Sequence, residues 1–131
     1  MKTIEKMMTK PAIATKADAT ATQVLFQILV GQYSGMPVID DHSNVVGVVT
    51  ELDLLKAIRA GKPLETTKVR DIMTASPITV TPSTDVEVVI DTMVQKGIIR
   101  IPVVENGKLI GIISRSDVLR AHHLPESVKY F

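Results

Sequence analysis

The 131-residue chain contains no cysteine and no tryptophan, and only two tyrosines and two phenylalanines. The lack of cysteine excludes disulfide bonds and thiolate metal ligands, and it is compatible with a reducing compartment. Because aromatic side chains are so few, the hydrophobic core must be built from valine, isoleucine, leucine and methionine. The same scarcity leaves little to stack on the bases of a single-stranded nucleic acid.

An excess of charge of either sign is also absent. Fifteen lysines and arginines face fourteen aspartates and glutamates, for a formal charge of +1. Without a basic stripe, no electrostatic argument favours a nucleic-acid or membrane partner. No apolar run approaches the roughly 20 residues of a membrane-spanning helix, and residues 1–10 lack an apolar signal-peptide segment. We therefore expect a soluble, cytoplasmic protein with neither kind of partner.

One stretch occurs twice in the chain, at residues 45–55 and 109–119. Each copy is an apolar run through a glycine, followed by a hydroxyl residue and, three positions later, an aspartate. The hydroxyl–aspartate pairs are Thr50/Asp53 and Ser114/Asp117. The function depends on what these two pairs do.

The repetition extends beyond this stretch. Met-Thr at 8–9 recurs at 73–74, and Pro-Val at 37–38 recurs at 102–103, both at an offset of 65 residues. The loop that follows is one residue shorter in the second copy, so the two aspartates lie 64 residues apart. Two copies of one unit therefore fill nearly the whole chain.

Each copy contains two helical patterns. Apolar residues spaced three and four apart predict an amphipathic helix over 21–29 in the first copy and over 86–94 in the second. A second helix is predicted over 51–60 and 115–122, ended by Gly61 and by Leu124-Pro125 respectively. The two copies therefore predict the same pair of helices.

Capping and turn signals mark the boundaries of these elements. Thr20 with Gln23, and Thr84 with Glu87, have the spacing of a capping box at a helix start. Asn106-Gly107 predicts a tight hairpin. A brief strand is expected within 11–15, and further strands are expected at 38–39, 45–49, 103–104 and 109–113.

The order strand, helix, strand, strand, helix defines an α+β fold of two β-α-β-β-α repeats, related by pseudo-two-fold symmetry and packed as one module. One repeat has too few strands to cover its own sheet, so the two should share a core. Apolar helix faces that remain uncovered indicate a homodimer. The expected boundaries are 7–61 for repeat 1, 62–69 for a linker, 70–124 for repeat 2 and 125–131 for a C-terminal tail.

This order of motifs resembles the CBS domain, named after cystathionine β-synthase, and two in tandem resemble a CBS domain pair over roughly residues 7–124. The resemblance implies a cleft between the repeats that holds an adenosyl ligand such as AMP, ADP, ATP or S-adenosylmethionine. It further implies that Asp53 and Asp117 bind ribose hydroxyls, with Thr50 and Ser114 near the ribose or phosphate.

The hydroxyl–aspartate pairs also have a purely structural interpretation. Ser/Thr-x-x-Asp at a helix start is a capping box, which by itself explains both pairs. A carboxylate can equally accept two hydrogen bonds from vicinal ribose hydroxyls, and a helix N-terminus attracts phosphate. The two roles do not exclude each other.

Arg100, two residues before Pro102, lies where the family often places a phosphate-binding basic residue; an exposed arginine at a strand start is the alternative. The first copy has Gly35 at that place, so Lys10, Lys16 or Arg100 itself would have to serve. The resemblance also implies contacts to the adenine, for which plain core packing is the alternative at each position. These contacts fall on Ile13, Ala14, Thr15, Gly35, Met36, Pro37, Ile78, Thr79, Val80, Ile101 and Pro102.

Of the two sites, the sequence favours the one centred on Asp117. The second copy retains Arg100 and the polar Thr79, whereas the first has Gly35 and Ala14 at the equivalent positions. Both departures from the family pattern therefore fall in the first copy.

The three histidines do not suggest a metal site or a catalytic group. His42 falls in a predicted turn, and adjacent His122 and His123 point about 100° apart on a helix. None has the spacing to activate Ser114 or Thr50 as a nucleophile. We expect no metal, no cofactor and no enzymatic activity.

Two functions are compatible with these sequence features. One is a regulatory module that binds an adenosyl ligand and signals to a separate effector protein or through its own oligomeric state. The other is a dimerising interaction scaffold whose ligand cleft is empty or vestigial. Binding of adenosyl ligands, with Asp53→Ala and Asp117→Ala as controls, separates them.

Overall fold

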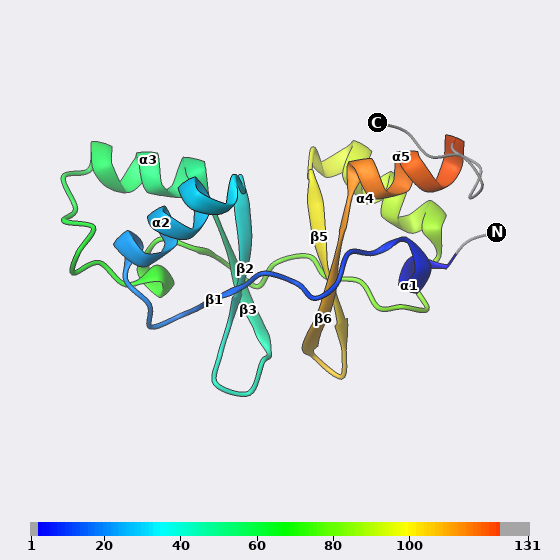
Figure 1. Cartoon of the computed structure of the whole chain (residues 1–131), viewed down its shortest axis with the longest axis horizontal. Coiled ribbons are helices and arrows are strands. Elements are labelled where there is room, and N and C mark those ends of the chain that lie inside the picture. The colour runs from blue at the N-terminus through cyan, green and yellow to red at the C-terminus, as the bar shows by residue number, and fades with distance from the viewer. Residues whose placement is uncertain (1–2, 124–131) are drawn as a thin grey trace. The chain divides into compact units, whose positions relative to one another are not determined.

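The structure is a computed structural model and describes residues 3–123 (Figure 1). The expected tail at 125–131, and the helix end at Leu124-Pro125, lie outside these residues. In chain order the elements are α1 (Ile4–Met7), β1 (Thr15–Lys16), α2 (Ala21–Gly31), β2 (Gly35–Ile39), β3 (Val45–Thr50), α3 (Glu51–Arg59), a 3-10 turn (Val69–Asp71), β4 (Thr74–Ala75), α4 (Val86–Lys96), β5 (Arg100–Glu105), β6 (Lys108–Ser114) and α5 (Arg115–His123). The predicted α+β class is confirmed.

The chain divides into two compact units, which we name after their motif aspartates. The Asp53 unit is Ile13–Pro77, and the Asp117 unit combines the described residues of Met1–Ala12 and Ile78–Phe131. These units do not coincide with the sequence repeats, because each includes a segment from the other repeat. The boundaries 7–61 and 70–124 therefore describe the repeats of the sequence and are not the boundaries of the compact units.

The two sheets share one plan. In the Asp53 unit the strand order is β1-β2-β3-β4, with β1 parallel to β2 and the other pairs antiparallel. In the Asp117 unit β5 pairs with β6, and single bridges at Val80–Val103 and Thr9–Ile112 take the places of β1 and β4. In each unit the two long helices lie on one side of the sheet (Figure 1).

One edge of each sheet is formed by the Met-Thr segment of the other repeat. Thr74 pairs with Val48 of the first copy, and Thr9 pairs with Ile112 of the second. Thr9 N–H donates to the Ile112 carbonyl at 2.8 Å, and Ile112 N–H donates back to the Thr9 carbonyl at 3.0 Å. The repeats therefore exchange strands.

The motif glycines, Gly47 and Gly111, make this exchange possible. A Cβ on Gly47 would lie 2.5 Å from the Met73 sulfur and 2.9 Å from the Thr74 carbonyl oxygen. A Cβ on Gly111 would lie 2.7 Å from the Met8 sulfur. Real Cβ contacts are longer than this, so the repeated glycine is explained by the close approach of the repeated Met-Thr.

Each unit has its own aliphatic core, as the composition requires. Val24, Ile28, Met36, Val38 and Val49 are among the buried residues of the Asp53 unit. The equivalent core of the Asp117 unit contains Val89, Met93, Ile101, Val103 and Ile113. The core of the Asp117 unit also takes in Ile4 from α1, a four-residue helix that the sequence patterns did not predict.

The hairpin prediction and one of the two helix-start predictions are confirmed. Asn106 and Gly107 have φ of 53° and 80°, as a two-residue turn of this type requires. Thr20 and Gln23 form a complete capping box on α2. The prediction for Thr84 was wrong: the N-cap of α4 is Asp85, without a side-chain cap bond, because the Thr84 hydroxyl instead accepts from Thr81 N–H at 2.9 Å.

The difference between these two threonines gives a test of the fold. We expect Thr20→Ala to lower the free energy of unfolding by about 1 kcal/mol, since it removes an N-cap acceptor. Thr84→Ala should cost less than about 0.5 kcal/mol, because the hydroxyl serves only an exposed turn. Urea unfolding followed by circular dichroism measures both, and equal costs would contradict the cap assignment.

Candidate ligand-binding site

Asp53 lies in the first turn of α3, where the chain passes from strand β3 into the helix. Its Oδ2 accepts from Thr50 N–H at 2.8 Å and from the Thr50 hydroxyl at 3.1 Å. Asp53 N–H donates back to Thr50 Oγ1 at 3.3 Å, which completes a capping box. Within residues 3–123, no side chain or amide donates to Oδ1 of this half-buried carboxylate.

Asp117 forms the same cap on α5 but has further partners. Ser114 N–H donates to Oδ2 at 2.9 Å, and Asp117 N–H donates to Ser114 Oγ at 3.1 Å. Oδ1 accepts from the Thr9 hydroxyl and from Arg120 Nη1, both at 3.3 Å. The side chain is only 6% exposed. The capping interpretation is thus confirmed for both aspartates, and both oxygens of Asp117 are already used.

The sequence reasoning missed Thr9 and Arg120 as neighbours of Asp117. Thr9 is separated from Asp117 by 108 positions, and only its place in the repeated Met-Thr pair hinted at a shared role. Arg120 lies three residues after Asp117 on α5, a spacing at which helical side chains meet. The i,i+3 charge pair was therefore readable from the sequence.

Strand register brings Arg100 to the second hydroxyl–aspartate pair. Arg100 lies opposite Ser114 across β5 and β6, and Gly35 lies opposite Thr50 across β2 and β3. A Cβ on Gly35 would lie 2.9 Å from the Val49 carbonyl oxygen, so the first copy has no space for a side chain there. Strand β2 of the first copy therefore has no basic residue equivalent to Arg100.

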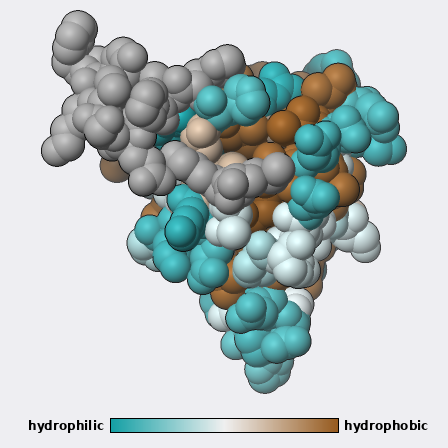
Figure 2. Space-filling model, turned by 90° about the vertical axis from the view of Figure 1, so that its right-hand side faces the viewer, coloured by the Kyte–Doolittle hydropathy of each residue, from teal (hydrophilic) through white to brown (hydrophobic). Residues whose placement is uncertain are grey.

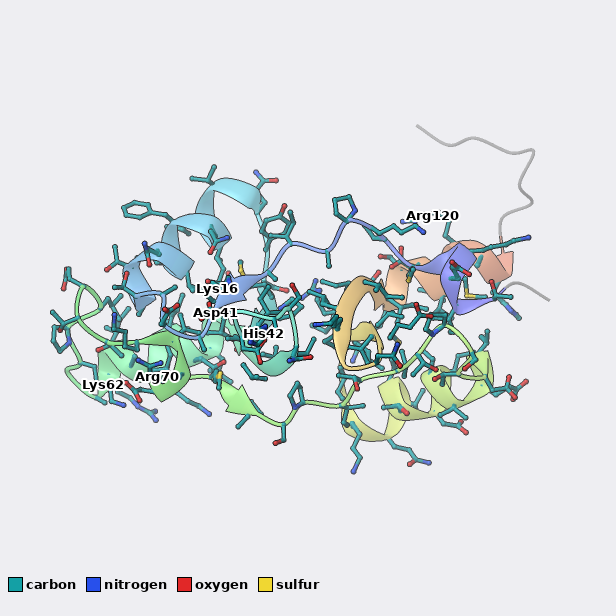
Figure 3. All side chains as sticks on the ribbon, turned by 90° about the horizontal axis from the view of Figure 1, so that it is seen from below. Lys16, Asp41, His42, Lys62, Arg70 and Arg120 are labelled. Atoms are coloured by element: carbon teal, nitrogen blue, oxygen red, sulfur yellow. The ribbon has the colours of Figure 1, made fainter. Side chains whose placement is uncertain are left out.

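Lys16, another cation considered for the first copy, has a partner of its own. Its Nζ lies 3.3 Å from Asp41 Oδ1 in the loop between β2 and β3, and the two are labelled in Figure 3. In the same loop, hydrogen bonds from the Asn44 side chain, the Asn44 backbone and His42 N–H lower the pKa of Asp40. These contacts order the loop at the far end of the hairpin from Asp53.

The residues predicted to contact adenine separate into exposed and buried groups. Ile13 and Ile78, at equivalent positions, are each 41% exposed. Met36 and Ile101 are buried in the cores of their own units. Each unit contains the complete set from one sequence copy: Ile13, Ala14, Thr15, Gly35, Met36 and Pro37 in one, and Ile78, Thr79, Val80, Ile101 and Pro102 in the other. A role for them in binding adenine remains a prediction.

Residues 3–123 contain neither a membrane-spanning helix nor a cluster of metal-ligating side chains. No helix there has the length and apolar character needed to cross a membrane. No three histidine, aspartate or glutamate side chains in that range are placed to hold a metal ion. The candidate site in each copy is the hydroxyl–aspartate pair at the start of the second helix.

Comparison with known proteins identifies the family. The profile of the CBS domain matches residues 4–60 and again residues 69–124. The chain therefore belongs to the CBS domain family and contains two copies of the domain. The resemblance inferred from the repeated motifs is confirmed.

Two curated relatives differ widely in length. An uncharacterised protein of Methanopyrus kandleri is 34% identical over 103 residues, which cover 77% of this chain and 53% of that protein. The inosine-5′-monophosphate dehydrogenase of Methanocaldococcus jannaschii is 28% identical over 130 residues, which cover 98% of this chain and 25% of the enzyme. The chain thus spans about half or less of the length of these relatives.

Solved structures share the fold over nearly the whole chain. CBSX2 of Arabidopsis thaliana, crystallised in complex with AMP, is 32% identical with a TM-score of 0.81, covering 93% of this chain and 96% of that one. A CBS domain pair crystallised with 5′-methylthioadenosine and S-adenosyl-L-methionine is 24% identical with a TM-score of 0.81, covering 92% and 95%. These two solved structures therefore hold adenosine-containing ligands.

Proposed function

We propose that this chain is a non-catalytic regulatory module that binds an adenosyl ligand through a motif aspartate and signals by a change in conformation or oligomeric state. The observation that carries the proposal is the half-buried Asp53, held in place through Oδ2 with Oδ1 left for a ligand. The AMP complex of CBSX2, at 32% identity, supports the ligand class.

The chemistry of the helix start suits a nucleotide. A carboxylate oriented by two hydrogen bonds can accept from the vicinal hydroxyls of a ribose without first losing a partner. The N-terminal turn of α3 offers amide donors and positive potential for a phosphate. Both features belong to one strand-to-helix transition, so a single ligand can use them together.

Asp53 suits a ribose better than Asp117, which reverses the preference drawn from the sequence. A ribose at Asp117 must compete with Thr9 and Arg120 for a carboxylate that is almost fully buried. Breaking the hydrogen bonds of a buried carboxylate costs free energy, because the charge then loses partners that water cannot replace. We therefore propose that the adenosyl ligand binds at Asp53 with higher affinity than at Asp117.

Calorimetric titration with AMP, ADP, ATP and S-adenosylmethionine tests the proposal. We expect saturable binding of at least one ligand, and chromatography should recover that ligand unchanged. Mass spectrometry of the purified protein would identify any ligand that co-purifies. If none of the four gives heat or a thermal shift, the sensor function is wrong; consumption of the ligand would contradict a non-catalytic role.

The alternative is a dimerising scaffold with an empty or vestigial ligand cleft, and the exposed helix surfaces agree with it. Both units expose large apolar side chains on their helices, among them Leu29, Leu55, Val94 and Leu119. Monomeric proteins rarely leave such surfaces in contiguous patches. We propose that the chain forms a homodimer in either case, so dimerisation alone does not distinguish the scaffold from the sensor.

A further inference from the structure

The Asp117 unit has more of the expected ligand-binding residues in its sequence, yet its carboxylate is the less accessible of the two. It retains the basic Arg100 and the polar Thr79, which have no polar counterparts in the Asp53 unit. Asp117 is nevertheless buried, whereas Asp53 is half-buried. The feature that limits access to Asp117 must therefore be sought among the side chains that contact it.

The groove on the helix side of this unit does not lead to the carboxylate. Figure 2, which faces the Asp117 unit, shows apolar surface bordered by hydrophilic residues. The apolar groove between α4 and α5 is lined by Ile90, Val94 and Leu119, among other side chains. Asp117 is not among them, so this groove gives no access to the carboxylate, whose side-chain neighbours are Thr9 and Arg120.

These two neighbours differ in how easily they can withdraw. The Arg120 side chain, labelled in Figure 3, is 61% exposed, and such exposed ion pairs contribute little free energy. Thr9 is held by its backbone, because its N–H and carbonyl pair with Ile112 at 2.8 and 3.0 Å. Its hydroxyl lies 3.3 and 3.4 Å from the two oxygens of Asp117, and a β-branched side chain has few alternative rotamers. Thr9 is therefore the harder contact to displace.

The threonine equivalent to Thr9 makes no such contact. Thr74 on β4 pairs with Val48, at the position equivalent to the pairing of Thr9 with Ile112. Within residues 3–123, however, the hydrogen bonds of the Asp53 carboxylate come from its own motif and none comes from Thr74. The same residue type at the same place in the sheet therefore covers one carboxylate and leaves the other accessible.

A single difference between the repeats explains this contrast. In the Asp53 unit the Thr50 hydroxyl donates to the motif carboxylate. In the Asp117 unit the Ser114 hydroxyl lies 3.0 Å from the hydroxyl of Ser116, and the residue equivalent to Ser116 in the first copy is Leu52. Because leucine has no hydrogen-bonding group, only the second copy has this competition. The second carboxylate then accepts from Thr9 in place of its own motif hydroxyl.

We propose that the Thr9 hydroxyl takes the place of a ribose hydroxyl at Asp117 and thereby limits the chain to one bound adenosyl ligand. The chemistry is the same in both cases, since an alcohol donates to a carboxylate. The Asp117 site is then latent, and removal of the Thr9 side chain opens it while Arg100 and Thr79 remain. This inference rests on the proposed function and adds the residue that sets the number of ligands per chain.

Calorimetric titration with AMP counts the sites. We expect one site in the wild-type chain and two in Thr9→Ala, the second with a dissociation constant within about 10-fold of the first. Thr9→Ser keeps a hydroxyl and should bind one ligand. Thr74→Ala, the matched change on β4, and Arg120→Gln should also bind one. Circular dichroism checks that each variant is folded.

Combined substitutions identify the second site. Adding Thr9→Ala to Asp53→Ala should restore the AMP binding that Asp53→Ala loses, and adding Asp117→Ala as well should abolish it again. One site in Thr9→Ala, two in the wild type, or a second site opened by Arg120→Gln instead, would overturn this inference alone. Absence of AMP binding in both the wild type and Thr9→Ala would also overturn it, and titration with the other three ligands then decides whether the proposed function fails too.

Discussion

Replacement of Gly47 by alanine is expected to lower the free energy of unfolding by about 2 kcal/mol. The added Cβ would lie 2.5 Å from the Met73 sulfur and 2.9 Å from the Thr74 carbonyl oxygen. The methionine can move, but the carbonyl belongs to strand β4, which pairs with β3 at this point. The substitution therefore pushes β4 away from the sheet. Urea unfolding followed by circular dichroism gives the change directly.

Gly111 supplies the matched comparison. Its added Cβ would lie 2.7 Å from the Met8 sulfur but 3.1 Å from the Thr9 carbonyl oxygen, a contact that small adjustments relieve. We expect Gly111→Ala to cost about 1 kcal/mol, less than Gly47→Ala. In a double-mutant cycle, Met73→Ala should recover part of the cost of Gly47→Ala. A neutral Gly47→Ala would mean that the Met-Thr segment does not pack as described.

The exchanged strands show where sequence reasoning succeeds and where it fails. Helices α2 and α4 were predicted because their apolar residues repeat with the helical period, and the hairpin at Asn106-Gly107 because its turn chemistry is local. The pairing of Thr9 with Ile112 has no local signal: both residues belong to repeated motifs, but the sequence does not say which copy pairs with which. Helix α1 is only four residues long, too short for a period to appear.

The candidate site shows the same limit. Its capping boxes were readable because residues three apart interact through one helix turn. The preference for Asp117 was drawn from Arg100 and Thr79, which belong to the same repeat. The contact of Asp117 with Thr9 comes from the other repeat through the strand exchange, and it occupies the oxygen that a ligand would need. Only the tertiary structure reveals this contact.

Asp53→Ala is expected to weaken the binding of AMP by at least about 100-fold, because it removes the acceptor for both ribose hydroxyls. Asp117→Ala removes an equivalent helix cap, so it controls for the loss of the cap itself. We expect it to change the affinity by less than about 5-fold. Isothermal titration calorimetry measures both variants against the wild-type protein.

A second variant at the same position distinguishes the loss of the negative charge from the loss of the helix cap. Asp53→Asn keeps one oxygen that can accept from Thr50 N–H, so α3 should retain its start, while the negative charge is lost. We expect an intermediate loss of affinity, about 10-fold. If Asp117→Ala abolished binding and Asp53→Ala did not, the ligand would use the carboxylate that Thr9 and Arg120 hold. Binding would then have to displace at least one of these contacts, and the free oxygen of Asp53 would have no part in the affinity.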